Sequence, residues 1–263
     1  MPPDASRVAP APGPAAVIAD DVARRLLRLL PPSVVLPVIA GPLRGYRWIT
    51  GAAPHGAWLG RLEPDLLRDF VAHIAPGDTV WDVGANVGLY TLAAARAAGP
   101  HGQVVAVEPI AANLSYLRRH LALNGLSGVE VVAAAACERD GPLRMAAGDS
   151  PSEYALAEHG AITVDGVRLD SMLDRAGARR PAVIKIDTEG AEGRILEGAA
   201  RVLGEARPRL YLSLHGAEPA EACRRQLEQW DYAISTLSGA PPGPVGEWIA
   251  VPRAGGRGTA APG

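Results

Sequence analysis

From residue 81 to residue 99 the chain reads WDVGANVGLYTLAAARAAG, an apolar run, a glycine-rich turn and an alanine-rich segment in succession. This order is typical of a buried strand that turns directly into a helix. Asp82, Gly84, Asn86 and Gly88 occupy alternate positions across the junction. A tight turn requires one or two glycines, but not an acid and an amide between them. We therefore expect a ligand to lie against this backbone.

The pattern around the turn predicts an α/β fold. Short apolar runs rich in Val, Ile and Leu indicate strands at 79–83, 103–108, 129–134, 182–187, 209–214, 232–237 and 246–251. Helical segments lie at 89–98, 113–124, 171–177 and 191–204, and Gly99, Gly125 and Gly204 are placed to end helices. This alternation predicts a doubly wound, mostly parallel seven-stranded sheet, with the two C-terminal runs as antiparallel edge strands.

The chain divides into four predicted parts. Residues 1–14 and 252–263 are rich in Pro, Ala or Gly and are expected to be disordered. Residues 15–75 are expected to form a helical lead-in that caps the substrate, with helices at 17–30 and 63–74. Residues 76–251 hold the alternating domain, and an inserted hairpin or lid is expected within 138–168.

Composition excludes several classes of protein. The 26 basic and 28 acidic residues give a net charge of −2, which offers no footprint for nucleic acid. Arg28 and four prolines interrupt the apolar stretch 26–43, so it predicts no membrane span. Two cysteines, Cys137 and Cys223, do not suggest a disulfide framework and suit a reducing cytoplasm. No feature of the sequence sets an oligomeric state.

The spacing in the turn favours one kind of ligand. A dinucleotide site has the pattern G-x-G-x-x-G, whereas here Asp82 stands where a pyrophosphate would be repelled. An acid beside helix-terminal amides suits a zwitterion, such as the amino-acid end of S-adenosylmethionine. Glu108 ends the next strand 24 residues after Gly84 (108 − 84), close to the interval at which an acid binds ribose hydroxyls.

Three segments carry a resemblance to a known family. DVGANVGLYTL, VVAVEPIAANLSYLRRHLALNG and IKIDTEGAEGRILEGA resemble the FkbM-type S-adenosylmethionine-dependent methyltransferases, and the likeness covers roughly residues 55–237. HGAWLGRLEP (55–64) is similar to the family's lead-in, although Arg61 and Leu62 replace the usual aromatic. The resemblance implies a class I, Rossmann-like methyltransferase. It implies that cofactor contacts come from Asp82, Gly84, Asn86, Gly88, Glu108, Asn113 and the backbone from Ala135 to Cys137.

The candidate catalytic residues lie at later strand ends. Lys185, the only lysine, falls within a strand expected to be buried, where its ammonium requires a carboxylate such as Asp187 or Glu189. Asp187 is expected to face or orient the substrate. His215, as a neutral imidazole, is a candidate base for a hydroxyl proton. A structural ion pair at Lys185 and a turn-capping role for His215 are the alternatives.

The remaining acids and histidines have less specific patterns. Glu189 and Glu192 share a helix face and, with Asp187, could ligate a divalent cation; we favour instead that they complement the helix dipole, with no metal. His55 and Glu63 are candidates to close over the substrate. The other four histidines are expected at the surface: His73, His101, His120 and His159.

The sequence thus predicts an S-adenosylmethionine-dependent methyltransferase that acts on a hydroxyl of a small molecule, a sugar or a secondary metabolite. O-methylation is preferred because the family resemblance implies it. Two alternatives stay open: an NAD-dependent oxidoreductase on the same architecture, and a binding module that keeps the cofactor site without turnover. The spacing at Asp82 argues against the first, and the presence of Asp82, Glu108 and Asp187 against the second.

Overall fold

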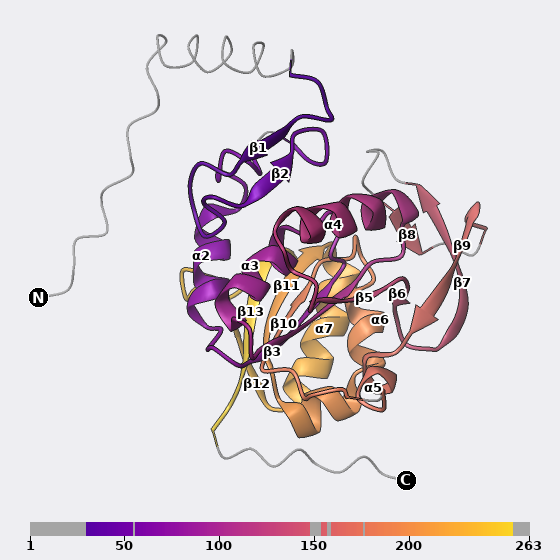
Figure 1. Cartoon of the computed structure of the whole chain (residues 1–263). Coiled ribbons are helices and arrows are strands. Elements are labelled where there is room, and N and C mark those ends of the chain that lie inside the picture. Colours follow the sequence, from indigo (N-terminus) through magenta and orange to yellow (C-terminus); the bar gives the residue numbers. More distant parts are fainter. Residues whose placement is uncertain (1–29, 55, 148–153, 157–158, 176, 255–263) are drawn as a thin grey trace, which may run out of the picture.

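The computed structural model describes residues 30–54, 56–147, 154–156, 159–175 and 177–254 (Figure 1). The tail expected at 1–14 lies outside the described residues. So does the tail expected at 252–263, except residues 252–254. The same is true of the helix expected at 17–30, except its last residue, and of His55.

A seven-stranded sheet forms the centre of the domain, in the order β12-β13-β11-β10-β3-β4-β5. Its strands are β3 (Thr79–Val83), β4 (Gln103–Val107), β5 (Glu130–Val132), β10 (Val183–Ile186), β11 (Arg209–His215), β12 (Tyr232–Ser235) and β13 (Val245–Pro252). β5, β4, β3, β10 and β11 pair in parallel, and β13 pairs antiparallel with both β11 and β12. The predicted mostly parallel, seven-stranded sheet is confirmed. Of the two C-terminal strands expected at an edge, β12 lies there, whereas β13 inserts between β12 and β11.

The strand order reverses direction at β3. The chain runs from β3 outward to β4 and β5, then returns to place β10 on the other side of β3. The carboxyl ends of β3 and β10 therefore adjoin, with Val83 opposite Ile186. In an open α/β sheet, ligands bind in the crevice at this reversal.

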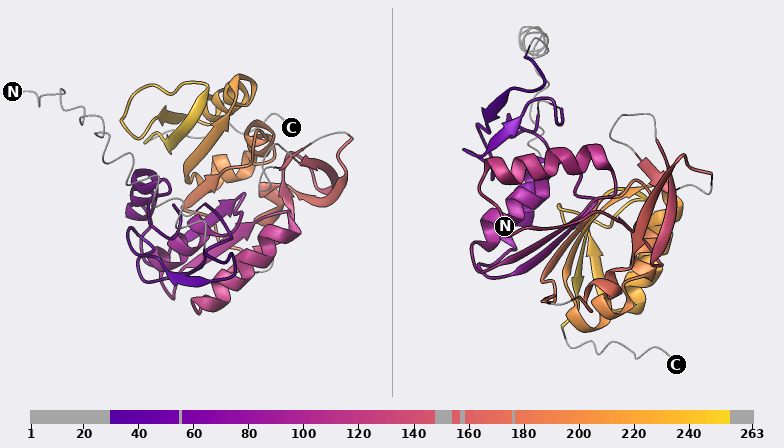
Figure 2. Two further views of the ribbon diagram at one scale, coloured as in Figure 1. Left: turned by 90° about the horizontal axis from the view of Figure 1, so that it is seen from above. Right: turned by 45° about the vertical axis from the view of Figure 1, so that its right-hand side comes forward.

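Helices cover both faces of the sheet (Figures 1 and 2). One core joins α2 (Pro64–Ala72), α3 (Leu89–Ala98) and α4 (Ala111–Leu123) to one face, and Val80 and Val104 point into it. The other core lies under α5 (Leu169–Met172), α6 (Glu192–Glu197) and α7 (Ala217–Gln229), and Trp81 and Val105 point into it. Successive strand residues thus enter opposite cores, which explains why the strands read as continuous apolar runs.

The lead-in is less helical than expected. Its described part begins with an antiparallel pair, β1 (Val35–Pro37) and β2 (Arg47–Ile49), and reaches a helix only at α2. His120 of α4 anchors this hairpin, because the Ile49 N–H donates to His120 Nε2 (3.0 Å) and Trp48 stacks on the imidazole ring at 4.1 Å. The expectation that His120 lies at the surface is wrong: the hairpin covers it completely.

An inserted sheet lies beyond the β5 side of the domain (Figures 1 and 2). It contains β6 (Ala135–Ala136), β7 (Gly141–Ala147), β8 (Tyr154–Leu156) and β9 (Ile162–Val167), in the order β6-β9-β7-β8. The hairpin expected within 138–168 is present as β7 paired with β8 and β9.

The segment after α6 ends differently from the prediction. A short π-helix, η1, spans Val202–Ala206, and Arg207 takes the left-handed position at φ 50°. Gly204 therefore does not end the helix. A Cβ at Gly204 would meet the Trp230 ring at 2.7 Å, so close packing explains this glycine.

Candidate functional site

The loop after β3 places three alternate residues in left-handed conformations. Gly84, Asn86 and Gly88 have φ values of 82°, 49° and 102°. Glycine takes such angles without strain, and asparagine is among the side chains that tolerate them best. The amides of Gly84 and Ala85 both donate to the Val107 carbonyl, at 2.9 and 3.0 Å. The alternating pattern in the sequence thus encodes a loop folded back onto the end of β4.

Glu108 fixes this loop from the neighbouring strand end. Its carboxylate accepts the Asn86 and Ile110 amides, both at 2.8 Å, and the Asn113 side-chain amide at 3.2 Å. Burial raises the pKa of Glu108, and these hydrogen bonds oppose the rise. Three donors leave a carboxylate room for another, because its two oxygens can accept about four hydrogen bonds.

A cavity opens on this side of the loop, and we call it the β4-side cavity. It encloses about 710 Å³, including space open to solvent, and Glu108, Asn113, Ala135, Met145 and Asp187 contribute to its walls. Cys137, expected near a bound nucleoside, is completely buried behind the wall, where its thiol donates to the Arg139 carbonyl. Ala134, Ala135 and Ala136 line the cavity instead.

A second cavity lies between the loop and the lead-in, and we call it the lead-in-side cavity. It encloses about 770 Å³, including open solvent, and its walls include Trp48, Leu62, Glu63, Tyr90 and Lys185. The Tyr90 hydroxyl donates to Glu63 Oε2 at 2.5 Å, which ties the lead-in to α3. Glu63, predicted to close over the substrate, stands in this wall.

The two cavities meet at three residues that line both: Gly84, Asn86 and Asp187. The Asp187 amide donates to the Val83 carbonyl at 2.9 Å, which continues the pairing of β3 and β10 to the mouth of the crevice. A Cβ at Gly84 would overlap the Asp187 carbonyl oxygen. Only glycine therefore allows this contact between the two strand ends.

Gly88 and Asp82 support the loop from inside the domain. A Cβ at Gly88 would meet Leu117 of α4 at 2.7 Å, so this glycine permits close helix packing and does not line either cavity. Asp82 is buried, accepts the Thr91 hydroxyl at 2.5 Å, and lines the lead-in-side cavity. Burial raises the pKa of Asp82 to about 6, although Thr91 and the Lys185 ammonium act to lower it.

Lys185 lies within a polar row that crosses four strands on the α2–α3 face. Asp82 pairs with Lys185 between β3 and β10, and Ser213 pairs with Glu247 between β11 and β13. The fully buried Lys185 Nζ donates to Ser213 Oγ and lies 3.4 Å from Asp187 Oδ2 and 3.5 Å from Glu247 Oε2. Burial lowers the pKa of Lys185, but the surrounding carboxylates outweigh this effect and raise it. The ammonium thus stays charged.

Sequence reasoning found only part of this row. The sequence offers Asp187 and Glu189 as partners of Lys185, whereas the structure places Asp187, Ser213 and Glu247 around its ammonium. The signal for Glu247 was present, because an acid interrupts an apolar run that forms a buried strand. The sequence does not show which strand lies beside the strand of Glu247, because that depends on the order of the strands in the folded sheet.

His215, at the end of β11, lies among three carboxylates. Its Nδ1 is 3.2 Å from Glu192 Oε1, and its Nε2 is 3.4 Å from Glu189 Oε2 and 3.7 Å from Asp187 Oδ1. The Glu192 hydrogen bond and the other carboxylates raise the pKa of His215 to about 9, against the opposing effect of burial. The imidazole is therefore protonated at neutral pH in this arrangement, contrary to the expected neutral form.

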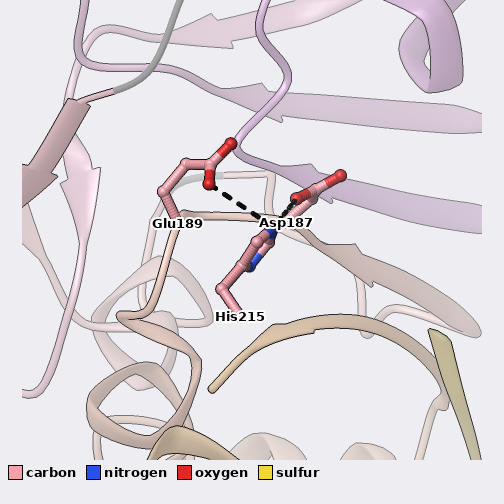
Figure 3. A group of neighbouring side chains, drawn as sticks. All are labelled: Asp187, Glu189 and His215. Atoms are coloured by element: carbon pink, nitrogen blue, oxygen red, sulfur yellow. Dashed lines mark ion pairs between the residues drawn. The ribbon is translucent and has the colours of Figure 1, made fainter. Parts of the chain in front are cut away.

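Glu192 has a different place from the one its spacing suggested. It is fully buried, and its Oε1 accepts the amides of Thr188 and Gly190 at 3.2 and 3.1 Å. These contacts hold the turn that precedes α6. The atoms that could ligate a cation come from Asp187, Glu189 and His215 instead (Figure 3).

The architecture of this chain is that of a class I methyltransferase: a mostly parallel seven-stranded sheet, one reversed strand beside an edge, and a crevice at the end of β3. The chain belongs to the FkbM methyltransferase family, since the model of the methyltransferase FkbM domain matches residues 82–237. The expected resemblance is thereby confirmed.

Solved structures of methyltransferases are similar to the chain. FkbM methyltransferase from Methylobacillus flagellatus KT is 18% identical, with 90% of this chain and 60% of that chain covered and a TM-score of 0.48. An S-adenosylmethionine-dependent O-methyltransferase from Thermotoga maritima is 13% identical, with 84% and 78% covered and a TM-score of 0.47. Fibrillarin from Aeropyrum pernix, solved with bound S-adenosylmethionine, is 13% identical, with 68% of each chain covered and a TM-score of 0.43.

The chain thus spans 60% of the length of the Methylobacillus protein. A comparison with curated proteins finds no match. Among the described residues, none of the helices combines the length and the apolar character needed to cross a bilayer.

Proposed function

We propose that this protein transfers the methyl group of S-adenosylmethionine to a hydroxyl group of a small molecule, a sugar or a secondary metabolite. The observation that carries the proposal is the meeting of two cavities at Gly84 and Asp187. A cofactor in one cavity and an acceptor in the other would bring sulfonium and nucleophile together at that junction. Family membership supports the cofactor.

The β4-side cavity suits the nucleoside. We assign the ribose hydroxyls to Glu108, whose carboxylate can accept a further hydrogen bond, and we place Asn113 beside it. The apolar walls at Ala135 and Met145 suit the flat face of adenine.

The methionine end would lie at the loop after β3. The first turn of α3 begins at Gly88 with no side-chain cap, so its amides favour a carboxylate. We assign the ammonium to Asp82 and the backbone around Gly84 and Asn86, because Asp82 is a buried acid with a single hydroxyl partner.

The acceptor would bind in the lead-in-side cavity, where a Trp48 ring and several polar groups form the walls. In the reaction, the acceptor oxygen forms a bond to the methyl carbon as the carbon–sulfur bond breaks, which releases S-adenosylhomocysteine and one proton. We assign the acceptance of that proton to Asp187, which lines both cavities. Lys185 and His215 then serve as positioning residues that hold the two Asp187 oxygens.

Two alternative functions were left open by the sequence. The family match to methyltransferases does not support an NAD-dependent oxidoreductase. An experiment distinguishes an active methyltransferase from a binding module without turnover, because the binding module would bind the cofactor but methylate none of a broad panel of acceptors. A reducing cytoplasm stays our expectation for the compartment, and both cysteines are free and buried thiols.

Calorimetry with S-adenosylhomocysteine tests the cofactor assignment. Glu108→Gln replaces one accepting oxygen by a donor that faces backbone amides, so we expect affinity to fall roughly 10- to 100-fold, the loss of about one to two hydrogen bonds to a charged group. Glu197→Gln, an exposed acid on α6, is the matched control and should bind as the natural protein does. No binding by the natural protein would refute the proposed function.

Mass spectrometry of hydroxyl and amine acceptors incubated with S-adenosylmethionine then tests the acceptor class. We expect one added methyl group on hydroxyl acceptors. Methylation of amines alone would overturn the O-methyl assignment and leave the cofactor assignment intact.

A further inference from the structure

Three side chains converge where β10 and β11 end, at the rim of the β4-side cavity. Asp187 follows β10, Glu189 lies two residues further on, and His215 ends β11. Figure 3 shows the two carboxylates and the imidazole turned toward one another. One ligand atom from each lies within 4.8 Å of the other two, and His215 Nε2 is 3.4 Å from Glu189 Oε2.

These separations suit a bound ion. Ligand atoms about 2.1 Å from a six-coordinate cation lie about 3.0 Å apart at neighbouring positions. The observed 3.4 and 3.7 Å around Nε2 require only small side-chain movements to reach that value. Carboxylate oxygens suit hard divalent cations, and manganese also accepts an imidazole nitrogen.

A buried carboxylate behind the histidine gives a second, independent observation. Glu192 has no exposed surface, and its Oε2 has no hydrogen-bond partner among the described residues. Its other oxygen faces His215 Nδ1 at 3.2 Å, which leaves Nε2 directed at Asp187 and Glu189. In proteins, a metal-binding histidine is commonly held by a carboxylate on its other nitrogen. A cation on Nε2 would also offset the charge of the incompletely paired Glu192.

The charges around the cluster point the same way. Six carboxylates surround Lys185 and His215: Glu63, Asp82, Asp187, Glu189, Glu192 and Glu247. A metal on Nε2 requires the neutral imidazole, so His215 releases its proton when the ion binds and the ion takes over its positive charge. S-adenosylmethionine carries one net positive charge and cannot balance the remainder. Hydrogen bonds from Tyr90, Thr91 and Ser213 partly compensate three of these carboxylates, and the remaining excess of negative charge in a half-buried site favours a further cation.

We propose that Asp187, Glu189 and His215 bind a divalent cation of the Mn²⁺ or Mg²⁺ kind at the rim of the β4-side cavity, where Asp187 also lines the lead-in-side cavity. Three protein ligands leave coordination positions open for water and for an oxygen of the acceptor. Its role rests on the proposed function: the ion would hold the acceptor oxygen beside the methyl group and ease the loss of its proton. The sequence-based preference for no metal omitted His215, which is distant in the chain.

Manganese binding to the full chain tests this proposal without any need for turnover. After removal of metals with a chelator, the natural protein is titrated with MnCl₂ by calorimetry and by electron paramagnetic resonance. Glu189→Gln and His215→Gln each remove one ligand, and Glu228→Gln removes an exposed acid at the far end of α7. Echo-envelope spectra of the Mn²⁺ complex report the imidazole nitrogen directly.

We expect one Mn²⁺ per chain, at least tenfold weaker binding in both ligand variants, and unchanged binding in Glu228→Gln. The nitrogen signal should be absent in His215→Gln and present in Glu189→Gln. Absence of binding at 1 mM Mn²⁺, or equal binding by all variants, overturns the proposal. The partly exposed Glu189 makes its variant informative even if His215→Gln fails to fold.

S-adenosylhomocysteine binding, measured on the same samples in chelator, separates this proposal from the proposed function. Cofactor binding without Mn²⁺ binding refutes the ion alone. Mn²⁺ binding without cofactor binding supports the ion site and refutes the proposed function.

Discussion

Gly84→Ala should damage both the fold and the site, because Gly84 is where two strand ends touch. At this position φ is +82°, and an added Cβ would overlap the carbonyl oxygen of Asp187. The overlap involves backbone on both sides, so neither partner can rotate away. Relief requires β3 and β10 to separate at their carboxyl ends.

The cost has two parts. An alanine in a left-handed conformation costs roughly 1 kcal/mol relative to glycine. The overlap adds roughly 1–3 kcal/mol, as other overpacking substitutions do. The free energy of unfolding should therefore fall by roughly 2–4 kcal/mol, with the melting temperature lower by about 2–4 °C for each kcal/mol in a domain of this size.

Gly77→Ala is the matched control, since Gly77 has φ +94° and no atom within 4 Å of an added Cβ. It should lose only the conformational part, roughly 1 kcal/mol. Urea denaturation followed by circular dichroism measures both variants, and calorimetry with S-adenosylhomocysteine should show weakened binding for Gly84→Ala alone. If the two variants lose equal stability and bind equally, the inferred role of the Gly84–Asp187 contact is wrong.

Three further predictions concern buried polar groups. Lys185→Met leaves Asp187 and Glu247 without their cation and should lower the free energy of unfolding, measured by urea denaturation, by roughly 3–5 kcal/mol. Adding Glu247→Gln should restore part of the lost stability. An unchanged stability in Lys185→Met would refute the ion-pair argument. Asp82 retains its proton to a higher pH in the folded state than in the unfolded state, so its contribution to stability falls as pH rises from about 4 to about 6. Asp82→Asn removes this pH dependence, so the difference in unfolding free energy between the natural protein and the variant should change by up to roughly 3 kcal/mol between about pH 4 and about pH 6. A difference that does not vary with pH would contradict the prediction. His120→Phe leaves the Ile49 N–H and Val87 carbonyl unpaired and should cost roughly 2–4 kcal/mol at pH 7. That cost should shrink below pH 6, because burial lowers the pKa of His120 and the natural protein loses stability as its unfolded chain binds the proton. Faster amide exchange at 47–50 in the variant would locate the effect in the hairpin, and no change there would argue against the anchoring role.

The sequence alone determined the elements that depend on local pattern. The apolar runs and the intervening helices specified the parallel sheet, because a strand buried on both faces has no alternative to an apolar composition. The turn at 82–88 specified its own conformation, since left-handed residues require glycine or asparagine. The place of Glu108 at the end of the next strand was predicted because its distance from the turn along the chain reflects the length of one helix and one strand.

The tertiary structure alone decided which distant groups meet. Ser213 and Glu247 reach Lys185 only because β13 inserts beside β11. His120 is buried because the lead-in hairpin covers it. His215, and not Glu192, joins Asp187 and Glu189 because β10 and β11 are neighbours in the sheet, which brings their carboxyl ends together. Spacing along the chain fixes a residue's position within its own strand or helix, but packing between strands fixes its partners and hence its charge state.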